Sequence, residues 1–286
     1  MNQTMEDTGK EVAKIMWLVF PPIYIVIGTI GNCLAILVLT RKRVHATTST
    51  IYLVALAVCD LIVLYASLFS TWIFKLLKTT FKTSFGCKVV HWLDFSSRDC
   101  SVWILVAITV DRIIACSAPF KYKFICSRMR AQIVVAATVF VIYGINAHLL
   151  YGLDMVTIEI NNTTSMTHCL FVSPEYGAFF NGFFVFFDFL KFSLIPLLVI
   201  LSGSIAIACL LYKKIIKVRR RVAPADEEQR STPLMSSTNM TLLALNAAFL
   251  VCTIPLGIFS MSASFSGEGN VVTYFRRFEI RIISAL

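Results

Sequence analysis

Six long apolar stretches recur along the chain, and this feature most limits what the chain can fold into. They lie at about 15–39, 50–74, 87–119, 133–151, 179–212 and 242–261, and a further one begins near Val271. An α-helix of about 20 apolar residues crosses a bilayer core of about 30 Å. A helix also satisfies its own backbone hydrogen bonds in lipid. The pattern predicts an all-α, polytopic membrane bundle.

The composition agrees with a membrane protein and argues against a nucleic-acid partner. Of the 286 residues, 57% are hydrophobic and 15% are charged, whereas soluble domains carry about 25% charged residues. The net charge of +10 comes from basic residues gathered in short segments between apolar stretches, which is the pattern that orients membrane proteins. The sequence lacks C-x-x-C and a nucleophile–base set, so we expect no enzyme and no transition-metal site.

The distribution of Lys and Arg also predicts the orientation. The main basic clusters lie at 41–43, 121–130 and 213–230. Positive loops stay in the cytosol, so residues 1–14 are expected to form an extracellular tail. Asn2, Asn161 and Asn162 begin N-x-[ST] sequons on that outer side and are expected glycosylation sites.

One face of the third apolar stretch carries polar groups. The steps between its members alternate between three and four residues, which aligns them on one side of a helix. These members are Asp94, Arg98, Ser101, Leu105, Ile108 and Arg112. Charged groups inside an apolar span are costly without partners or a function, so we expect this face to look into the protein interior.

Residues 156–171 have the pattern of a β-hairpin. Val156 to Ile160 alternates as a strand does, and Asn161-Asn162 supplies turn residues. The returning strand would bring Cys169 to the outer end of the third stretch, near Cys87. A disulfide between these two cysteines would require a Cα separation of about 4.4–6.8 Å.

Short motifs occur along the chain in a recognisable order. They are Gly31-Asn32, Leu56-Ala57-x-x-Asp60, Cys87, Asp111-Arg112-Ile113 followed by Pro119, Pro196, and Phe249-x-x-Cys252-x-x-Pro255. In this order they resemble rhodopsin-like (class A) G-protein-coupled receptors. The segment from Ser101 to Arg112 is similar to invertebrate neuropeptide receptors of the FMRFamide type. The resemblance implies a multi-pass plasma-membrane receptor with seven helices, an extracellular peptide ligand and a heterotrimeric G protein.

The chain also departs from the family pattern. Thr253 replaces the usual tryptophan before the sixth-span proline, and Ser204 replaces a fifth-span tyrosine. The chain ends before an Asn-Pro-x-x-Tyr motif, so we expect a receptor domain at 15–286 that is truncated within helix 7. A non-signalling receptor fragment is therefore an alternative to a signalling receptor.

The resemblance assigns roles to two polar pairs. Asp60 and Ser101 would hold a sodium ion, a hard cation that prefers oxygen ligands; alternatively, Asp60 is a buried carboxyl that hydrogen-bonds to Asn32. Asp111 would restrain Arg112 in the inactive state until a G protein binds. Alternatively, Arg112 only extends its charge to the membrane interface.

Four further charged residues are the expected ligand contacts, namely Asp94, Arg98, Asp188 and Lys191. In family members, an acid at the position of Asp94 binds the amine of aminergic ligands, so a biogenic amine receptor is the alternative function. Asp188 and Phe192 stand where a catecholamine would need hydroxyl groups, which disfavours that ligand. A further alternative is that Asp94 and Arg98, four residues apart, only pair with each other.

The resemblance also predicts the moving parts. Pro196, Val102 and Phe249 would form a core switch, and Pro255 would be the hinge of the sixth helix. The basic run at 213–221 would contact the G protein or anionic membrane lipid, although charge at a cytosolic helix end explains it equally well. A transporter would show repeat symmetry between the chain halves, which we do not find.

Overall fold

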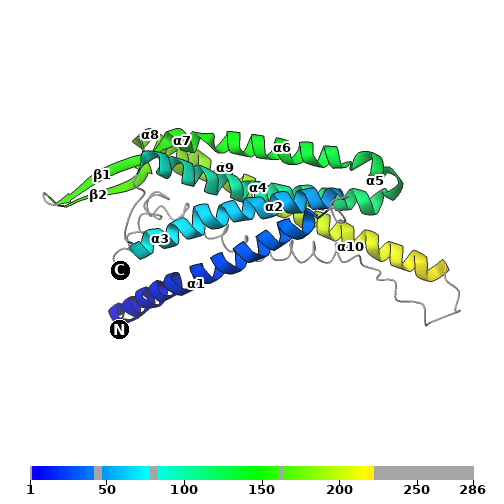
Figure 1. Cartoon of the computed structure of the whole chain (residues 1–286), viewed down its shortest axis with the longest axis horizontal. Helices are drawn as coiled ribbons and strands as arrows, with labels where there is room; N and C mark the ends of the chain where they lie inside the picture. The colour runs from blue at the N-terminus through cyan, green and yellow to red at the C-terminus, as the bar shows by residue number, and fades with distance from the viewer. Residues whose placement is uncertain (1, 42–46, 78–82, 162–163, 222–286) are drawn as a thin grey trace.

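A computed structural model of the chain describes residues 2–41, 47–77, 83–161 and 164–221 (Figure 1). Phe249, Pro255 and Asn162 lie outside these residues, as do the expected sixth and seventh spans. Asn2 and Asn161 are described by their backbone alone, so glycosylation at these positions stays a prediction.

Five helical stretches of the described chain are long and apolar enough to cross a membrane, at Ile15–Leu39, Thr48–Phe74, Ser84–Ser117, Arg128–Gly152 and Pro174–Lys213. They match the first five predicted spans and confirm the α-helical membrane bundle. The first helix, α1 (Asn2–Leu39), begins well before its predicted span. The segment before Ile15 lacks proline and contains good helix formers such as Glu and Lys.

The second, third and fourth spans are built from these elements: α2 (Thr48–Val63), a π-helical turn η1 (Leu64–Phe69), α3 (Ser70–Leu77), α4 (Ser84–Ser117), α5 (Pro119–Ile125), α6 (Arg128–Ile145), a 3-10 turn η2 (Asn146–His148) and α7 (Leu149–Gly152). The Thr83 side chain caps α4 by accepting a hydrogen bond from the Gly86 amide at 3.1 Å. Pro119 starts α5, because its ring and missing N–H suit a first helical position better than a helix interior.

The fifth span alternates between α-helix and π-helix. Its elements are α8 (Pro174–Phe179), η3 (Phe180–Phe184), α9 (Val185–Asp188), η4 (Phe189–Leu194) and α10 (Ile195–Arg221). The second π-helical turn ends directly before Ile195-Pro196. π-Turns occur often at functional sites, and this one carries Lys191.

Among the five described spans, the third, α4, is the most central. Buried residues make up 44% of its most apolar window, against 6% to 22% in the other four spans. Figure 1 shows α4 running between α2 and α6. The core cluster joins these helices and consists of Tyr52, Cys59, Cys100, Ile104, Ile108, Ala131 and Ile142. The charged side chains of the predicted polar face are partly buried, with Asp94, Arg98 and Arg112 at 17%, 34% and 15% exposure.

The predicted hairpin is present. Strands β1 (Leu153–Asn161) and β2 (Thr164–Phe171) pair antiparallel, with Met155 opposite Cys169. The hairpin begins three residues earlier than predicted and projects beyond the helices at one end of the bundle (Figure 1). We call this the hairpin end, and the opposite end, where α5 lies, the α5 end.

Candidate functional site

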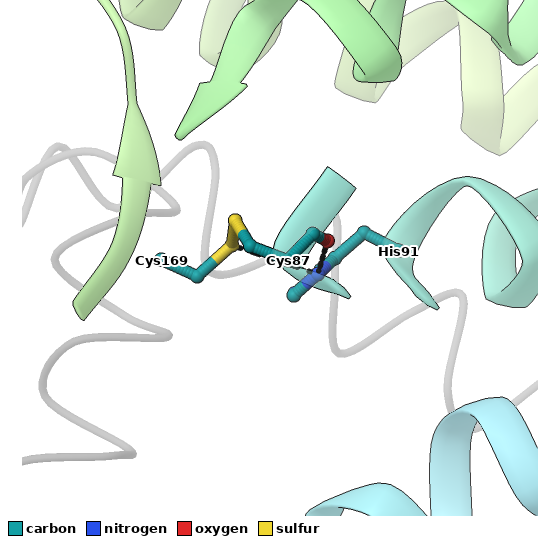
Figure 2. A group of neighbouring side chains, drawn as sticks. All are labelled: Cys87, His91 and Cys169. Carbon is teal, nitrogen blue, oxygen red and sulfur yellow. Dashed lines mark hydrogen bonds between the residues drawn. A yellow bond between two sulfur atoms is a disulfide. The ribbon is translucent and has the colours of Figure 1, made fainter. Parts of the chain in front are cut away.

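A disulfide ties the hairpin to α4. Cys87 and Cys169 are bonded, and their Cα atoms are 5.7 Å apart, within the expected range (Figure 2). Cys87 is fully buried near the first turn of α4. The bond links residues separated by 82 positions, so it fixes where the hairpin sits over the helices.

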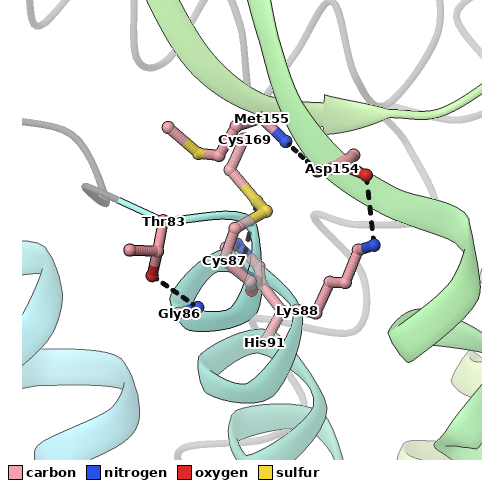
Figure 3. Close-up of a disulfide and its surroundings, with 8 residues drawn as sticks. All are labelled: Thr83, Gly86, Cys87, Lys88, His91, Asp154, Met155 and Cys169. Atoms are coloured by element: carbon pink, nitrogen blue, oxygen red, sulfur yellow. Dashed lines mark hydrogen bonds and ion pairs between the residues drawn. A yellow bond between two sulfur atoms is a disulfide. The ribbon is translucent and has the colours of Figure 1, made fainter.

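An ion pair supports the same junction. Lys88 Nζ lies 3.1 Å from Asp154 Oδ2 (Figure 3). Hydrogen bonds from Ser84 and Lys88 lower the pKa of Asp154 to about 2. Asp154 also accepts a hydrogen bond from the Met155 amide at 2.7 Å. The base of β1 is therefore anchored beside the disulfide.

The disulfide junction holds a histidine but does not form a metal site. Among the described residues, one group brings three possible metal-ligand atoms within 4.8 Å of one another, and it consists of Cys87, His91 and Cys169. Both sulfurs are bonded to each other (Figure 2), and a metal requires free thiolates. His91 Nδ1 instead donates to the Cys87 carbonyl oxygen at 2.8 Å.

Asp94 and Arg98 pair one turn apart on α4. The Arg98 guanidinium lies 3.1 Å from Asp94 Oδ2, and its carbon lies 4.7 Å from the centre of the Phe95 ring. The second Asp94 oxygen is buried and has no hydrogen-bond partner in the part of the chain that the structure describes. The pair is thus formed as the spacing indicated, while a ligand role for either residue stays a prediction.

Lys191 lies in a buried cluster that joins three spans. Its ammonium group donates to Asp99 Oδ2 on α4 and, at 3.0 Å, to Asn146 Oδ1 on η2. It also lies 3.1 Å from Asp188 Oδ1 on α9. Asn146 completes the cluster by donating to Asp99 Oδ2 at 2.8 Å. The third, fourth and fifth spans are therefore linked by buried polar contacts.

Two members of this cluster, Asp99 and Asn146, are missing from the residues that the sequence singled out. Asp99 is adjacent to Arg98 but lies off the polar stripe of α4, and Asn146 follows an apolar run. A signal was nevertheless present, because a lysine inside an apolar span requires an acidic partner.

Aromatic rings surround these charges. Phe95 lies 6.2 Å from Phe180 and 6.3 Å from Phe184, between ring centres. Lys191 Nζ lies 5.5 Å from the centre of the Phe184 ring. Trp103 on α4 donates its indole N–H to the Lys191 carbonyl oxygen at 3.2 Å. We call the charged and aromatic surface formed by α4 and the fifth span, from Asp94 to Trp103 and from Phe180 to Lys191, the α4 wall.

The predicted sodium ligands lie next to each other where α4 packs against α2. The Ser101 hydroxyl donates to Asp60 Oδ1 at 2.7 Å. Asn32, which was the alternative partner of Asp60, donates to the Gly28 carbonyl oxygen at 2.9 Å. A carboxylate and a hydroxyl oxygen side by side fit a hard cation. Occupancy by sodium stays a prediction.

Asp111 is the centre of a hydrogen-bond network at the α5 end. Arg112 lies 3.2 Å from Asp111 Oδ2. Asp111 also accepts hydrogen bonds from the hydroxyls of Thr48 and Tyr122, each at 3.1 Å. Arg112 Nε is buried, and residues 2–41, 47–77, 83–161 and 164–221 provide it with no hydrogen-bond partner. Burial, with the nearby Asp111 charge, raises the pKa of Cys126 to about 11, so this thiol remains protonated beside Asp111.

Two of the predicted switch residues are described. Val102 on α4 and Pro196 at the start of α10 are both buried. Val102 is adjacent in sequence to Ser101 and Trp103, which contact the second and fifth spans. Their part in switching stays a prediction.

Comparison with known proteins then decides the family. The family model described as "7 transmembrane receptor (rhodopsin family)" matches residues 31–283. The chain belongs to this family. It is therefore a receptor and not an enzyme, and the expected rhodopsin-like class is confirmed. The FMRFamide-type subgroup stays a prediction.

Individual relatives are similar over parts of the chain. The thyrotropin-releasing hormone receptor of Gallus gallus is 28% identical over 173 residues, which cover 56% of this chain and 42% of the relative. The QRFP-like peptide receptor of Branchiostoma floridae is 29% identical over 139 residues, which cover 49% of this chain and 37% of the relative. Somatostatin receptor type 2 of Sus scrofa is 27% identical over 241 residues, covering 83% and 61%. The chain thus spans less than two thirds of the length of these relatives.

Proposed function

We propose that this rhodopsin-family chain is a receptor for an extracellular peptide and activates a heterotrimeric G protein. The observation that carries the proposal is the α4 wall, where charged and aromatic side chains lie together close to the hairpin end. Ionisable groups inside a membrane bundle mark functional sites. A surface with several charges suits a polar ligand with many hydrogen-bonding groups better than a hydrocarbon chain. Two of the relatives bear the names of a hormone receptor and a peptide receptor, which supports a peptide.

The proposed orientation places the hairpin end outside the plasma membrane. Disulfides persist in oxidising surroundings, and Cys87–Cys169 lies at this end. The basic residues of α5 and of the last turns of α10 lie on the opposite side of the membrane spans, where the positive-inside rule puts the cytosol. The N-terminus would then be extracellular, as the sequence predicts.

In the proposed mechanism, ligand at the α4 wall shifts an equilibrium between two helix packings. A ligand shifts such an equilibrium only by its differential affinity for the two states. The hydrogen bonds of Asp111 with Thr48 and Tyr122 and its ion pair with Arg112 would stabilise the inactive packing. Release of Arg112 would then present its guanidinium to the G protein. A sodium ion at Asp60 and Ser101 would favour the same inactive state.

A signalling screen in cells tests the proposal. The complete open reading frame is expressed, and calcium and cAMP are measured with amidated peptides and with biogenic amines. We expect a peptide response that Arg112→Ala abolishes at unchanged surface expression, because the variant lacks the group that meets the G protein. Asp94→Ala is tested alongside as the variant that distinguishes the ligand classes.

The other outcomes would contradict the proposal in distinct ways. A response to an amine that is lost in Asp94→Ala would establish the amine receptor. Full coupling by Arg112→Ala would refute the mechanism. Good surface expression without any response would favour the non-signalling fragment.

A further inference from the structure

The charges of the α4 wall do not balance. Among the described residues, it contains three carboxylates and two basic groups, which leaves an excess of one negative charge. They are Asp94, Asp99 and Asp188 against Arg98 and Lys191. Uncompensated charge is costly away from water. The wall is therefore matched to a partner that brings one positive charge.

Lys191 is already held by three partners among the described residues. Its ammonium group donates hydrogen bonds to Asp99 and Asn146 and forms an ion pair with Asp188. Its side chain is 6% exposed, and that of Asp99 is 2% exposed. Asp99 is in turn held by both Lys191 and Asn146. A buried group of three residues thus hydrogen-bonds within itself and holds the spans of the α4 wall together, namely Lys191, Asp99 and Asn146.

Asp188 is the member of the cluster with the most exposed side chain and with unused hydrogen-bond acceptor positions. Its side chain is 25% exposed, more than that of Lys191 or Asp99. Its Oδ1 is buried 3.1 Å from Lys191 Nζ in an ion pair without a hydrogen bond, and this oxygen has no hydrogen-bond partner among the described residues. A carboxylate has about four acceptor positions, so most of the capacity of Asp188 is unused.

The other acid near the surface is already neutralised. Asp94 pairs with Arg98 at 3.1 Å, and Arg98 is held over the Phe95 ring. A cation that approached Asp94 would have to compete with this guanidinium. By contrast, among the described residues a cation at Asp188 competes with Lys191, whose ammonium group would keep its bonds to Asp99 and Asn146. The excess charge is thus most available at Asp188.

We propose that Asp188 binds the cationic group of the ligand, a guanidinium or an ammonium. This inference rests on the proposed function, because it names the chemistry that the same receptor site recognises. The bound cation neutralises the excess charge, and Lys191 remains with Asp99 and Asn146. The Phe184 and Phe187 rings, which already face Lys191 at 5.5 and 5.9 Å, add cation–π attraction.

The test uses two probes of the same shape and different charge. Benzamidine carries an amidinium cation, and benzamide is its neutral counterpart. Each is titrated into the full chain in lipid nanodiscs, and thermal unfolding is followed with a thiol-reactive dye that reports exposure of the buried Cys59 and Cys100 after the accessible thiols are blocked. We expect benzamidine to raise the unfolding temperature more than benzamide does, since only the cation balances the charge.

Variants then locate the effect. In Asp188→Asn the advantage of benzamidine should disappear, with at least a tenfold loss of its affinity, and Asp188→Ser serves as a second neutral variant. Asp188→Glu should retain the advantage. Glu175→Gln is the matched control, because Glu175 is an exposed acid in α8 of the same span, and it should retain the advantage too.

Two results would overturn the proposal. One is an equal shift by both probes in the unmodified chain. The other is an advantage of benzamidine that persists in Asp188→Asn and Asp188→Ser, whatever Asp94→Asn does. Binding is measured without signalling, so failure here is distinct from failure of the proposed function. Once a ligand is found, peptides with citrulline in place of arginine and a set of amines separate the two sources of the cation.

Discussion

Removal of the Asp99 charge tests the buried cluster most directly. Asp99→Asn keeps the shape of the side chain but leaves the Lys191 ammonium with Asp188 as its remaining carboxylate among the described residues. Breaking a buried ion pair at one partner costs about 3–5 kcal/mol. Because Asp188 at 3.1 Å still compensates part of the charge, we expect a loss near the lower limit, about 3 kcal/mol. Lys191→Met leaves two carboxylates unpaired and should cost at least as much.

The double variant distinguishes a coupled pair from two independent effects. With both Asp99→Asn and Lys191→Met, no uncompensated ammonium remains, so the loss should be close to that of one single variant. Additive effects would instead give about 6 kcal/mol, and the difference is a coupling free energy of about 3 kcal/mol. Equilibrium unfolding in mixed detergent–SDS micelles measures these free energies for the full chain.

Asp94→Asn is the matched control, because Asp94 lies five residues before Asp99 on the same helix. The Asp94–Arg98 pair is partly exposed, at 17% and 34%, and such pairs contribute about 1 kcal/mol or less. A coupling free energy below about 0.5 kcal/mol between Asp99 and Lys191, or an equal cost for Asp94→Asn, would refute the reasoning.

Two further predictions concern the ends of the bundle. Because the pKa of Asp154 is lowered to about 2 by hydrogen bonds from Ser84 and Lys88, its contribution to hairpin stability is complete above about pH 4 and is lost as the pH falls toward 2. Hydrogen exchange of the hairpin should therefore accelerate over that range relative to Asp154→Asn, and parallel profiles would contradict this role. At the α5 end, Tyr122→Phe removes the hydroxyl that donates to Asp111, at a cost of about 1 kcal/mol. We expect about fivefold higher ligand-free signalling at matched surface expression, and unchanged basal signalling would exclude a restraining role.

Hydropathy and local spacing were sufficient for much of the fold. The five described spans follow from apolar runs, since a bilayer admits few alternatives to a helix. The hairpin follows from the strand-like alternation that precedes its turn residues, and the Cys87–Cys169 bridge follows from the return of the second strand toward the start of α4. The Asp94–Arg98 pair follows from the helical repeat alone. Each of these features depends on residues close in sequence or on a boundary that the membrane imposes.

The partners of Lys191 could not be predicted from hydropathy and local spacing. Asp99 and Asn146 lie 92 and 45 residues from it in sequence, and their approach depends on how the third, fourth and fifth spans pack. The π-helical turn η3, which precedes both Asp188 and Lys191, also rotates the side chains that follow it relative to a regular helix. A constant helical repeat along the fifth span therefore misplaces Lys191 and Asp188 relative to α4.

The indole of Trp103 gives the fifth span a fixed point on α4. Its hydrogen bond holds the backbone of Lys191, and Asp99 holds the side chain of the same residue. A slip of one residue along the helix axis displaces these atoms by about 1.5 Å, which would break both contacts together. The fifth span can thus turn about this level more readily than it can slide. A small displacement of the fifth span at the hairpin end would then be accompanied by a displacement of α10, beyond Pro196, in the opposite direction.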